Sequence, residues 1–275
     1  MIARKRLPAE FEAWNDIWGS PFGYRGNRLY REGVMPQRAV VEATLNPADP
    51  DFGPFAFQMN SDTRVYEYPW AFSTAKPEAG MRVLDIGGGV SGLQYVLAKS
   101  GCEVTNFDPS ARPDYESSFD ANFRMNPELH ASLNTIFGTA VRLVAEKIQD
   151  ADLEPGSLDR AFCLSVLEHV DPEEARQMIG GMARLLRPGG LALLTVDLFL
   201  DLKPFGVLER NVWGINQDLG ALVKGSGLAL ADGDPRELLG FPEFDFDRVV
   251  RLIPELRIGR YYPVMTQTLV LEKPQ

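Results

Sequence analysis

The chain has 275 residues, of which 45% are hydrophobic and 24% charged, and its formal net charge is -10. This composition is ordinary for a soluble globular protein, and the length suits one large domain with or without an appendage. The acidic balance argues against a nucleic-acid partner, which needs a basic face. No apolar run approaches the ~18 residues that span a membrane, and residues 1–10 lack the apolar core of a signal peptide.

The cysteine content consists of Cys102 and Cys163. Their spacing fits neither a metal site nor a disulfide framework, and Cys163 lies in an apolar run typical of a buried strand. We therefore expect no bound metal and a reducing, cytoplasmic location.

Residues 1–78 form a region of distinct composition, rich in aromatic side chains and proline and weak in periodicity. We expect a short helix from Glu10 to Trp18 and a turn-rich stretch over 46–54. Two interpretations stay open for this N-terminal extension: an irregular structural wrap, or a lid or substrate-binding region over a pocket. For the lid, Tyr68 and Trp70 are the expected residues.

From Gly80 onward, apolar runs alternate with amphipathic segments, which predicts a parallel sheet covered on both faces. The expected strands are 82–86, 103–107, 141–146, 159–166 and 191–197, followed by 228–231 and 263–272. The expected helices include one from Pro127, capped by Asn126 and ended by Gly138, one from Asp171 to Leu186, and one from Gln217 to Lys224. The fold class is therefore α/β, with a doubly wound, mostly parallel sheet of seven strands in a domain over 79–275.

The most informative segment runs from Val83 to Gly92 with the sequence VLDIGGGVSG. It predicts a buried strand, a glycine turn and a helix whose free N–H groups and positive dipole end face a ligand. Ser91 and Gln94 have the spacing of a capping box, which would start the helix just after the glycines. This arrangement is typical of a nucleotide-type cofactor site.

Two cofactors compete at this turn. Gly87, Gly89 and Gly92 match the dinucleotide fingerprint, in which the helix N-terminus binds a pyrophosphate. However, the carboxylate of Asp85 would repel a pyrophosphate and attract the ammonium and sulfonium groups of S-adenosylmethionine. Asp108, 16 residues after Gly92, ends the second strand, where a carboxylate binds ribose hydroxyls in either case; its alternative role is a turn former before Pro109.

Six segments together resemble the class I S-adenosylmethionine-dependent methyltransferases, with their Rossmann-like fold. They occur in the family's order and spacing over about residues 80–197, and they are VLDIGGG (83–89), FD (107–108), QDA (149–151), SLD (157–159), SVLEHV (165–170) and LRPGG (186–190). Any one segment is a weak signal, whereas six in order are a strong one.

The resemblance implies a role for each matching residue. Asp85 and the turn at Gly87, Gly88 and Gly89 would hold the methionine part of S-adenosylmethionine, and Asp108 the ribose. Gln149 and Asp150 would face the adenine, and Ser165 would border the methionine amino group. The chain departs from the family at Ser91, which stands where the third glycine is usual, with Gly92 one position later.

His169 is the candidate catalytic residue. An imidazole has a pKa near neutrality and suits a general base, but the same residue has an alternative role in shaping the loop at a helix start. His130 is expected to be structural. Asp197 and Asp201 leave the fifth strand at the edge where substrates bind, and they suit either a polar substrate or a solvated loop.

The resemblance implies transfer of a methyl group to a small-molecule acceptor, a sugar or natural-product intermediate, at oxygen or nitrogen. Two alternatives remain: an NAD(P)-dependent Rossmann oxidoreductase, and a non-catalytic methyltransferase-like binding protein. The sequence predicts neither the acceptor nor the oligomeric state.

Overall fold

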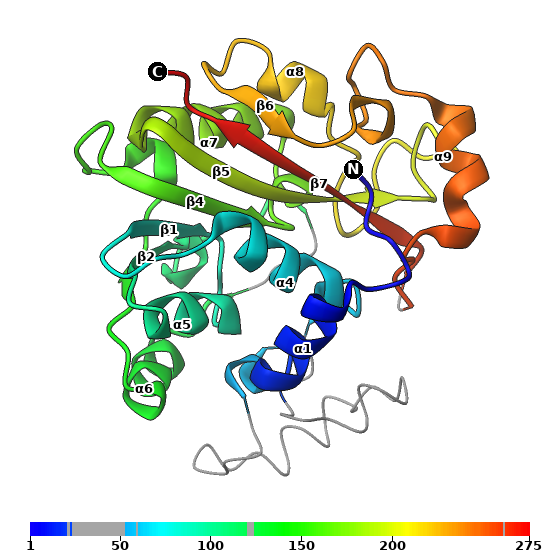
Figure 1. Cartoon of the computed structure of the whole chain (residues 1–275). Helices are drawn as coiled ribbons and strands as arrows, with labels where there is room; N and C mark the ends of the chain where they lie inside the picture. The colour runs from blue at the N-terminus through cyan, green and yellow to red at the C-terminus, as the bar shows by residue number, and fades with distance from the viewer. Residues whose placement is uncertain (21–22, 24–52, 59, 120–123, 261) are drawn as a thin grey trace.

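A seven-stranded sheet forms the centre of the computed structural model (Figure 1), which describes residues 1–20, 23, 53–58, 60–119, 124–260 and 262–275. The strand order is β3-β2-β1-β4-β5-β7-β6. Strands β1 to β5 run parallel, and β7 runs antiparallel to both β5 and β6. The bounds are β1 Arg82–Ile86, β2 Glu103–Phe107, β3 Arg142–Val144, β4 Leu158–Leu164, β5 Leu186–Phe199, β6 Ala229–Asp232 and β7 Val264–Glu272. The predicted seven-stranded, mostly parallel α/β fold is confirmed.

Helices cover both faces of the sheet (Figure 1). One face carries α1 (Ala9–Trp18), α4 (Arg64–Ala75), α5 (Gly92–Lys99) and α6 (Pro127–Phe137), whose apolar side chains share a core with it. The opposite face carries α7 (Pro172–Leu185) and α8 (Leu219–Val223) over a second core. The helix α9 (Phe246–Leu252) packs with residues of β5 and β7 in a smaller cluster. Because successive side chains of a strand point to opposite faces, β1 supplies Val83 to one core and Leu84 to the other.

The described part of the N-terminal extension packs against the sheet as a structural layer. Trp14 of α1 meets Phe55 of the 3-10 turn η1 (Pro54–Phe57), with ring centroids 5.7 Å apart. Tyr68 and Trp70, which we expected in a lid, are buried in α4 at 3% and 6% exposure. The lid prediction is wrong for these two residues, because their helix packs on β4 and β5 and their side chains belong to the core.

Element bounds differ from the expected ones mainly around β5. This strand begins at Leu186 rather than at 191, because Leu186 already pairs with Leu158 before an irregularity in the register. The strand β3 is shorter than expected, and so is α8, which begins at Leu219. Gln217 instead donates its side-chain amide to the backbone carbonyls of Leu167 and Val170 at 2.6 and 2.9 Å. No helix in the described ranges is long and apolar enough to cross a membrane.

Candidate active site

The strand order reverses between β1 and β4, and ligands of open α/β sheets bind at the carboxyl ends of the strands beside such a reversal. The glycine turn, defined as residues 87–91, follows β1 at this point. Gly87 and Gly89 have φ angles of +64° and +55°, a region that favours glycine. A Cβ atom on Gly88 would lie 2.4 Å from Oδ2 of Asp85. The turn therefore folds directly over the carboxyl group of Asp85.

Asp85 is a buried carboxyl group with unused bonding capacity. Its side chain is 3% exposed, and its Oδ2 has no hydrogen-bond partner among the described residues. Burial, and then the nearby Asp108, raise the pKa of Asp85 to about 7. A cation placed beside the turn would favour the ionised form and would remove this cost.

Three amide side chains fix the backbone of the glycine turn, and sequence reasoning gave none of them this role. Asn106 donates to the Gly89 carbonyl at 2.9 Å, and Gln94 donates to the same carbonyl at 3.0 Å. Gln58, from the extension, accepts the Val90 N–H at 2.8 Å. The sequence signal for such a contact was Asn106, a polar side chain at a position of β2 that faces the interior.

The helix α5 begins as expected, but the capping box does not form. Ser91 is the N-cap, and its Oγ accepts the Leu93 N–H at 3.4 Å. Gln94 should return a hydrogen bond to the Ser91 N–H, whereas its amide instead donates to the Ser91 carbonyl at 3.0 Å. The reason is that Asn106 and His130 take the other end of Gln94, its Oε1, at 3.0 and 3.1 Å.

Asp108 has the turn-forming role that was one of the two alternatives in the sequence, and its other oxygen contacts the glycine turn. It is the N-cap of the short turn η2 (Pro109–Ala111) and accepts the Ser110 N–H and hydroxyl at 3.0 and 2.5 Å. Its Oδ2 accepts the Gly89 N–H at 2.9 Å. Burial raises its pKa, and these hydrogen bonds oppose the rise. Since a carboxylate oxygen accepts two hydrogen bonds, Oδ2 keeps one position for a ligand.

Gln149 and Asp150 lie on the turn η3 (Ile148–Asp150) after β3. The Gln149 amide contacts Gln177 of α7 at 3.4 Å, and Asp150 is exposed to solvent. The structure thus brings Asp85, the glycines and Asp108 into contact, whereas Gln149 is bonded to a helix of the other face.

Ser165 lies at the tip of β4, next to the glycine turn. Its φ of +51° is unusual for a residue with a side chain and marks local strain. The next residue, Val166, has its Cγ2 2.8 Å from the position that a Cβ on Gly87 would take. The Ser165 hydroxyl accepts from Arg64 at 2.7 Å and donates to Glu67 at 3.3 Å, which connects the β4 tip to α4.

Four residues from α4, the turn η4 (Leu167–His169) and β5 form what we call the buried charged cluster: Glu67, Glu168 and Asp197, which are buried, and Arg64, whose side chain is 15% exposed. Arg64 contacts both carboxylate oxygens of Glu67 at 2.6 Å. Glu67 also accepts the Thr195 hydroxyl at 2.6 Å. Sequence reasoning missed Arg64, Glu67 and Glu168, because the extension showed no motif and Glu168 stood beside the more conspicuous His169.

Two carboxyl groups of this cluster have strongly raised pKa values. Burial raises the pKa of Glu168 to about 7, and the backbone N–H groups of Glu168 and Asp197 and the charge of Arg64 oppose the rise. Burial, Glu168 and Glu67 raise the pKa of Asp197 to about 8. Asp197 is thus a buried cluster residue, which excludes the solvated-loop interpretation, whereas Asp201 is half-buried and bonded to Asn211.

His169 ends the turn η4 (Leu167–His169). Its Nδ1 lies 2.5 Å from the Trp213 carbonyl, and its Nε2 lies 3.9 Å from Glu168 Oε1. Burial lowers its pKa, which favours a neutral ring. A neutral imidazole donating through Nδ1 leaves Nε2 as an acceptor. This geometry allows a proton-accepting role, and it also allows the structural role that we kept as the alternative.

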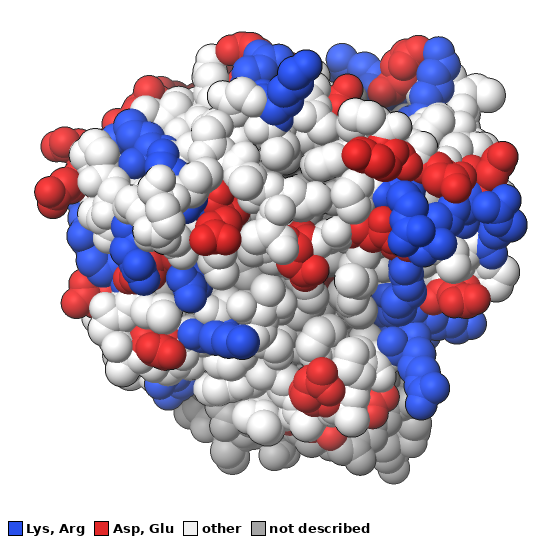
Figure 2. All heavy atoms as spheres, turned by 45° about the horizontal axis from the view of Figure 1, so that its top comes forward, with Lys and Arg blue, Asp and Glu red and all other residues white. Residues whose placement is uncertain are grey.

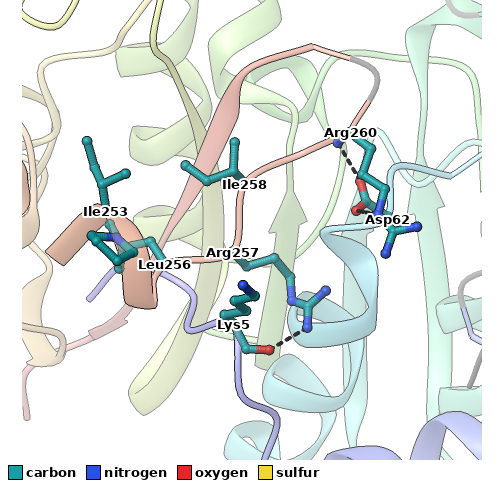
Figure 3. A pocket seen from close by; sticks show the side chains of 8 residues that line it. Lys5, Asp62, Ile253, Leu256, Arg257, Ile258 and Arg260 are labelled. Atoms are coloured by element: carbon teal, nitrogen blue, oxygen red, sulfur yellow. Dashed lines mark hydrogen bonds and ion pairs between the residues drawn. The ribbon is translucent and has the colours of Figure 1, made fainter. Parts of the chain in front are cut away.

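A separate cavity of ≈ 320 Å³ lies between the N-terminal segment and residues 253–260 (Figure 3). Arg257 crosses it and donates to the Lys5 carbonyl at 2.7 Å, and the Arg260 N–H donates to Asp62 at 3.0 Å. None of its lining residues belongs to the glycine turn or to the buried charged cluster, so it is distinct from the candidate active site.

The family model described as "Methyltransferase domain" matches residues 64–219. It covers both the glycine turn and the buried charged cluster. The chain belongs to this family, whose members use S-adenosylmethionine, and the resemblance seen in the sequence is confirmed.

Curated relatives include a ubiquinone biosynthesis O-methyltransferase of Xanthomonas euvesicatoria pv. vesicatoria, 30% identical over 179 residues, covering 58% of this chain and 67% of the relative. A ubiquinone biosynthesis O-methyltransferase of Azotobacter vinelandii is 29% identical over 176 residues, covering 56% of this chain and 67% of the relative.

Solved structures show the same fold. The 1,6-didemethyltoxoflavin-N1-methyltransferase of Burkholderia thailandensis gives a TM-score of 0.50 at 17% identity, covering 100% of this chain and 95% of that one. The [4+2]-cyclase SpnF gives a TM-score of 0.54 at 14% identity, covering 79% of this chain and 85% of that one. At these identities the likeness shows the fold alone.

Proposed function

We propose that this protein transfers the methyl group of S-adenosylmethionine to the oxygen or nitrogen of a small-molecule acceptor, a sugar or natural-product intermediate. The family supports the reaction type. The net charge of -10 supports a small molecule over a nucleic acid. Acidic and basic side chains are also intermixed on the face in Figure 2, which includes acidic side chains near its centre, unlike the basic stripe of a nucleic-acid protein.

The observation that carries this proposal is the unpartnered Oδ2 of Asp85 beneath the glycine turn. A buried carboxyl group with a raised pKa suits a positively charged ligand and disfavours a pyrophosphate. We assign Asp85 and the turn at Gly87, Gly88 and Gly89 to the methionine part of the cofactor.

The other assignments follow the carboxyl edge of the sheet. Asp108 holds the ribose through its free acceptor position, and Ser165 borders the methionine amino group. Gln149 and Asp150 face the adenine, which for Gln149 requires that its contact with Gln177 be released.

S-adenosylmethionine, when bound, supplies a methyl group already activated on a positively charged sulfur. The chain therefore contributes mainly alignment and exclusion of water, and alignment alone lowers such a barrier by up to about 7–11 kcal/mol. His169 is our candidate base for an acceptor that must lose a proton. We place the reaction in the cytoplasm.

Calorimetric titration with S-adenosylhomocysteine and, separately, with NADH tests the cofactor assignment. We expect micromolar binding of the first and no binding of the second. Asp108→Asn should weaken S-adenosylhomocysteine at least ten-fold, whereas Asp114→Asn, at an exposed carboxylate paired with Arg112, should leave it unchanged. Binding of NADH alone would establish the oxidoreductase alternative.

A labelled-methyl screen over sugars, phenols and amines tests turnover. Transfer to any acceptor class supports the proposal. Cofactor binding without transfer to any extract fraction would identify a non-catalytic binding protein instead.

A further inference from the structure

Two carboxyl groups at the carboxyl end of β4 and β5 have bonding capacity that the protein does not use. Glu168 is 0% exposed and Asp197 is 1% exposed. Both oxygens of Glu168 and Oδ2 of Asp197 have no hydrogen-bond partner of normal geometry in the part of the chain that the structure describes. The remaining oxygen of Asp197 accepts the Thr266 hydroxyl at 2.9 Å. Buried carboxylate oxygens are costly unless a ligand or a proton satisfies them.

The charges around this pair do not balance. The buried charged cluster contains three carboxyl groups and one guanidinium, that of Arg64. Arg64 is committed to Glu67, with Nη1 2.6 Å from both of its oxygens. The two remaining carboxyl groups therefore need either a shared proton or an incoming cation.

Aromatic side chains border the same pair. Tyr262 stacks on Trp213 with ring centroids 5.2 Å apart and lies 5.9 Å from the ring of Phe199. Burial raises the pKa of the Tyr262 phenol, and the nearby charges of Asp197 and Glu168 add to the rise. Trp213 and Tyr262 are only partly buried, so they form the outer side of the cluster. A carboxylate pair beside aromatic rings is the chemistry that binds an ammonium group.

The geometry points to Glu168 and Asp197 as the binding site and proton acceptor for the amino group of the methyl acceptor, which is therefore an amine. This inference rests on the proposed methyl transfer and adds the acceptor class. An acidic acceptor is disfavoured, because its negative charge would face two carboxyl groups whose charge Arg64, already paired with Glu67, compensates only in part.

The chemistry balances in two steps. One N–H bond of the bound ammonium breaks, its proton moves to a carboxylate oxygen of the pair, and the electron pair stays on nitrogen. That electron pair then forms the new N–C bond while the C–S bond of the cofactor breaks, and its electrons remain on sulfur. The raised pKa values of Glu168 and Asp197, about 7 and about 8, suit carboxyl groups that hold a proton at neutral pH.

Calorimetry with two probes of the same shape tests the acceptor class. In the presence of S-adenosylhomocysteine, 2-phenylethylamine should bind at least ten-fold more tightly than 2-phenylethanol. Asp197→Asn and Glu168→Gln should each remove this preference. Asp201→Asn, which changes the next acid along the chain, is the matched control and should keep it.

Proton release gives a readout that a merely structural role would not move. Titration at pH 7 in two buffers of different ionisation enthalpy should show release of on the order of one proton when the amine binds. Asp197→Asn should abolish the release. The charged and titratable groups facing the pair, which the variants leave in place, are Arg64, Glu67, Cys163, His169 and Tyr262.

Three results would overturn the inference. The first is that the two probes bind equally well or that neither binds. The second is that the preference for the amine persists in both variants. The third is that Asp197→Asn lowers S-adenosylhomocysteine affinity ten-fold without loss of amine binding. The last result would assign the pair to the cofactor. Failure of S-adenosylhomocysteine to bind the unmodified protein would instead refute the proposed function, and the two kinds of failure are therefore distinct.

Discussion

The glycine turn and the buried charged cluster lie at neighbouring strand ends but are built in opposite ways. The turn is one continuous stretch after β1, and its shape depends on the backbone conformation of its glycines, which the side chains of Gln58, Gln94 and Asn106 hold in place. The cluster is assembled from α4, η4 and β5, and its properties depend on burial and on charges far apart in the sequence. The turn is thus a local motif with supporting contacts, whereas the cluster exists only through contacts between separate elements.

This difference predicts that the cluster is the more sensitive region to loss of a single charge. Arg64→Met removes its guanidinium and leaves Glu67 buried without its ion pair. We expect a loss of about 3–5 kcal/mol in the free energy of unfolding, because a buried charge without a partner is costly. Urea unfolding at pH 7 measures it. Arg112→Met, at an exposed pair, is the control with no expected change, and a loss below ~1 kcal/mol for Arg64→Met would contradict the prediction.

The pH dependence of stability sharpens the comparison, since both regions contain carboxyl groups with raised pKa values. Asp85 and Glu168 have pKa values of about 7 and Asp197 of about 8, above their usual values of 3.8, 4.5 and 3.8. Each of these groups binds a proton more tightly in the folded state, so its contribution to stability is full below its unfolded-state pKa and is lost as the pH rises through its folded-state pKa. Between about pH 5 and 6 the loss is up to about 1.4 kcal/mol per pH unit for a single such group.

Thermal unfolding of the protein between pH 5 and 8 measures this slope. Asp197→Asn should reduce the slope of stability against pH by the contribution of one carboxyl group. Asp201→Asn should leave this slope unchanged. A stability that rises over this range would show that the three carboxyl groups are not the dominant titrating groups.

A smaller effect is expected from adding one methyl group to the turn. In Gly88→Ala the new Cβ would lie 2.4 Å from Asp85 Oδ2, so the turn must shift, at a cost of about 1–3 kcal/mol. S-adenosylhomocysteine affinity should fall at least ten-fold with it. Gly180→Ala, in open space on α7, is the matched control and should raise stability by about 0.5–1 kcal/mol. Unchanged affinity in Gly88→Ala would show that the ligand does not depend on this turn.

The smallest effect concerns Ser91, where the chain departs from the family pattern. Because its Oγ caps α5, Ser91→Ala should cost about 1 kcal/mol and Ser91→Gly only a few tenths. We expect S-adenosylhomocysteine affinity to stay within two-fold in both. A ten-fold loss in Ser91→Ala alone would show that the hydroxyl contacts the cofactor.

The predicted bounds of the strands β1 and β2 agree with those in the structure. The predicted ends of the helices α1 and α7 lie within one residue of the observed ends. These elements have buried apolar runs or clear capping residues. The helix α4 was not predicted, because its aromatic side chains are buried on most sides and leave no polar stripe to set a period. The start of β5 was also wrong, since a proline and two glycines suggested a turn, whereas Leu186 already pairs with Leu158 before an irregularity in the register.

For the site, the sequence singled out three features that the structure brings into contact: Asp85, the glycines and Asp108. Their contact with one another follows from two adjacent strands that end at the same edge. Residues that act through distant partners were missed, among them Gln58, Arg64 and Glu67. The assignments of Gln149 and Asp150 to the adenine stay predictions.

The sequence by itself determined the α/β class, the glycine turn and the family, because each depends on residues close together in the chain whose geometry the local backbone sets. Only the tertiary structure decided that Asp197 and Glu168 are buried with unused oxygens, and that Arg64 is committed to Glu67. Burial and charge balance are sums over every neighbour in space, and α4, β4, β5 and β7 become neighbours only when the sheet is complete.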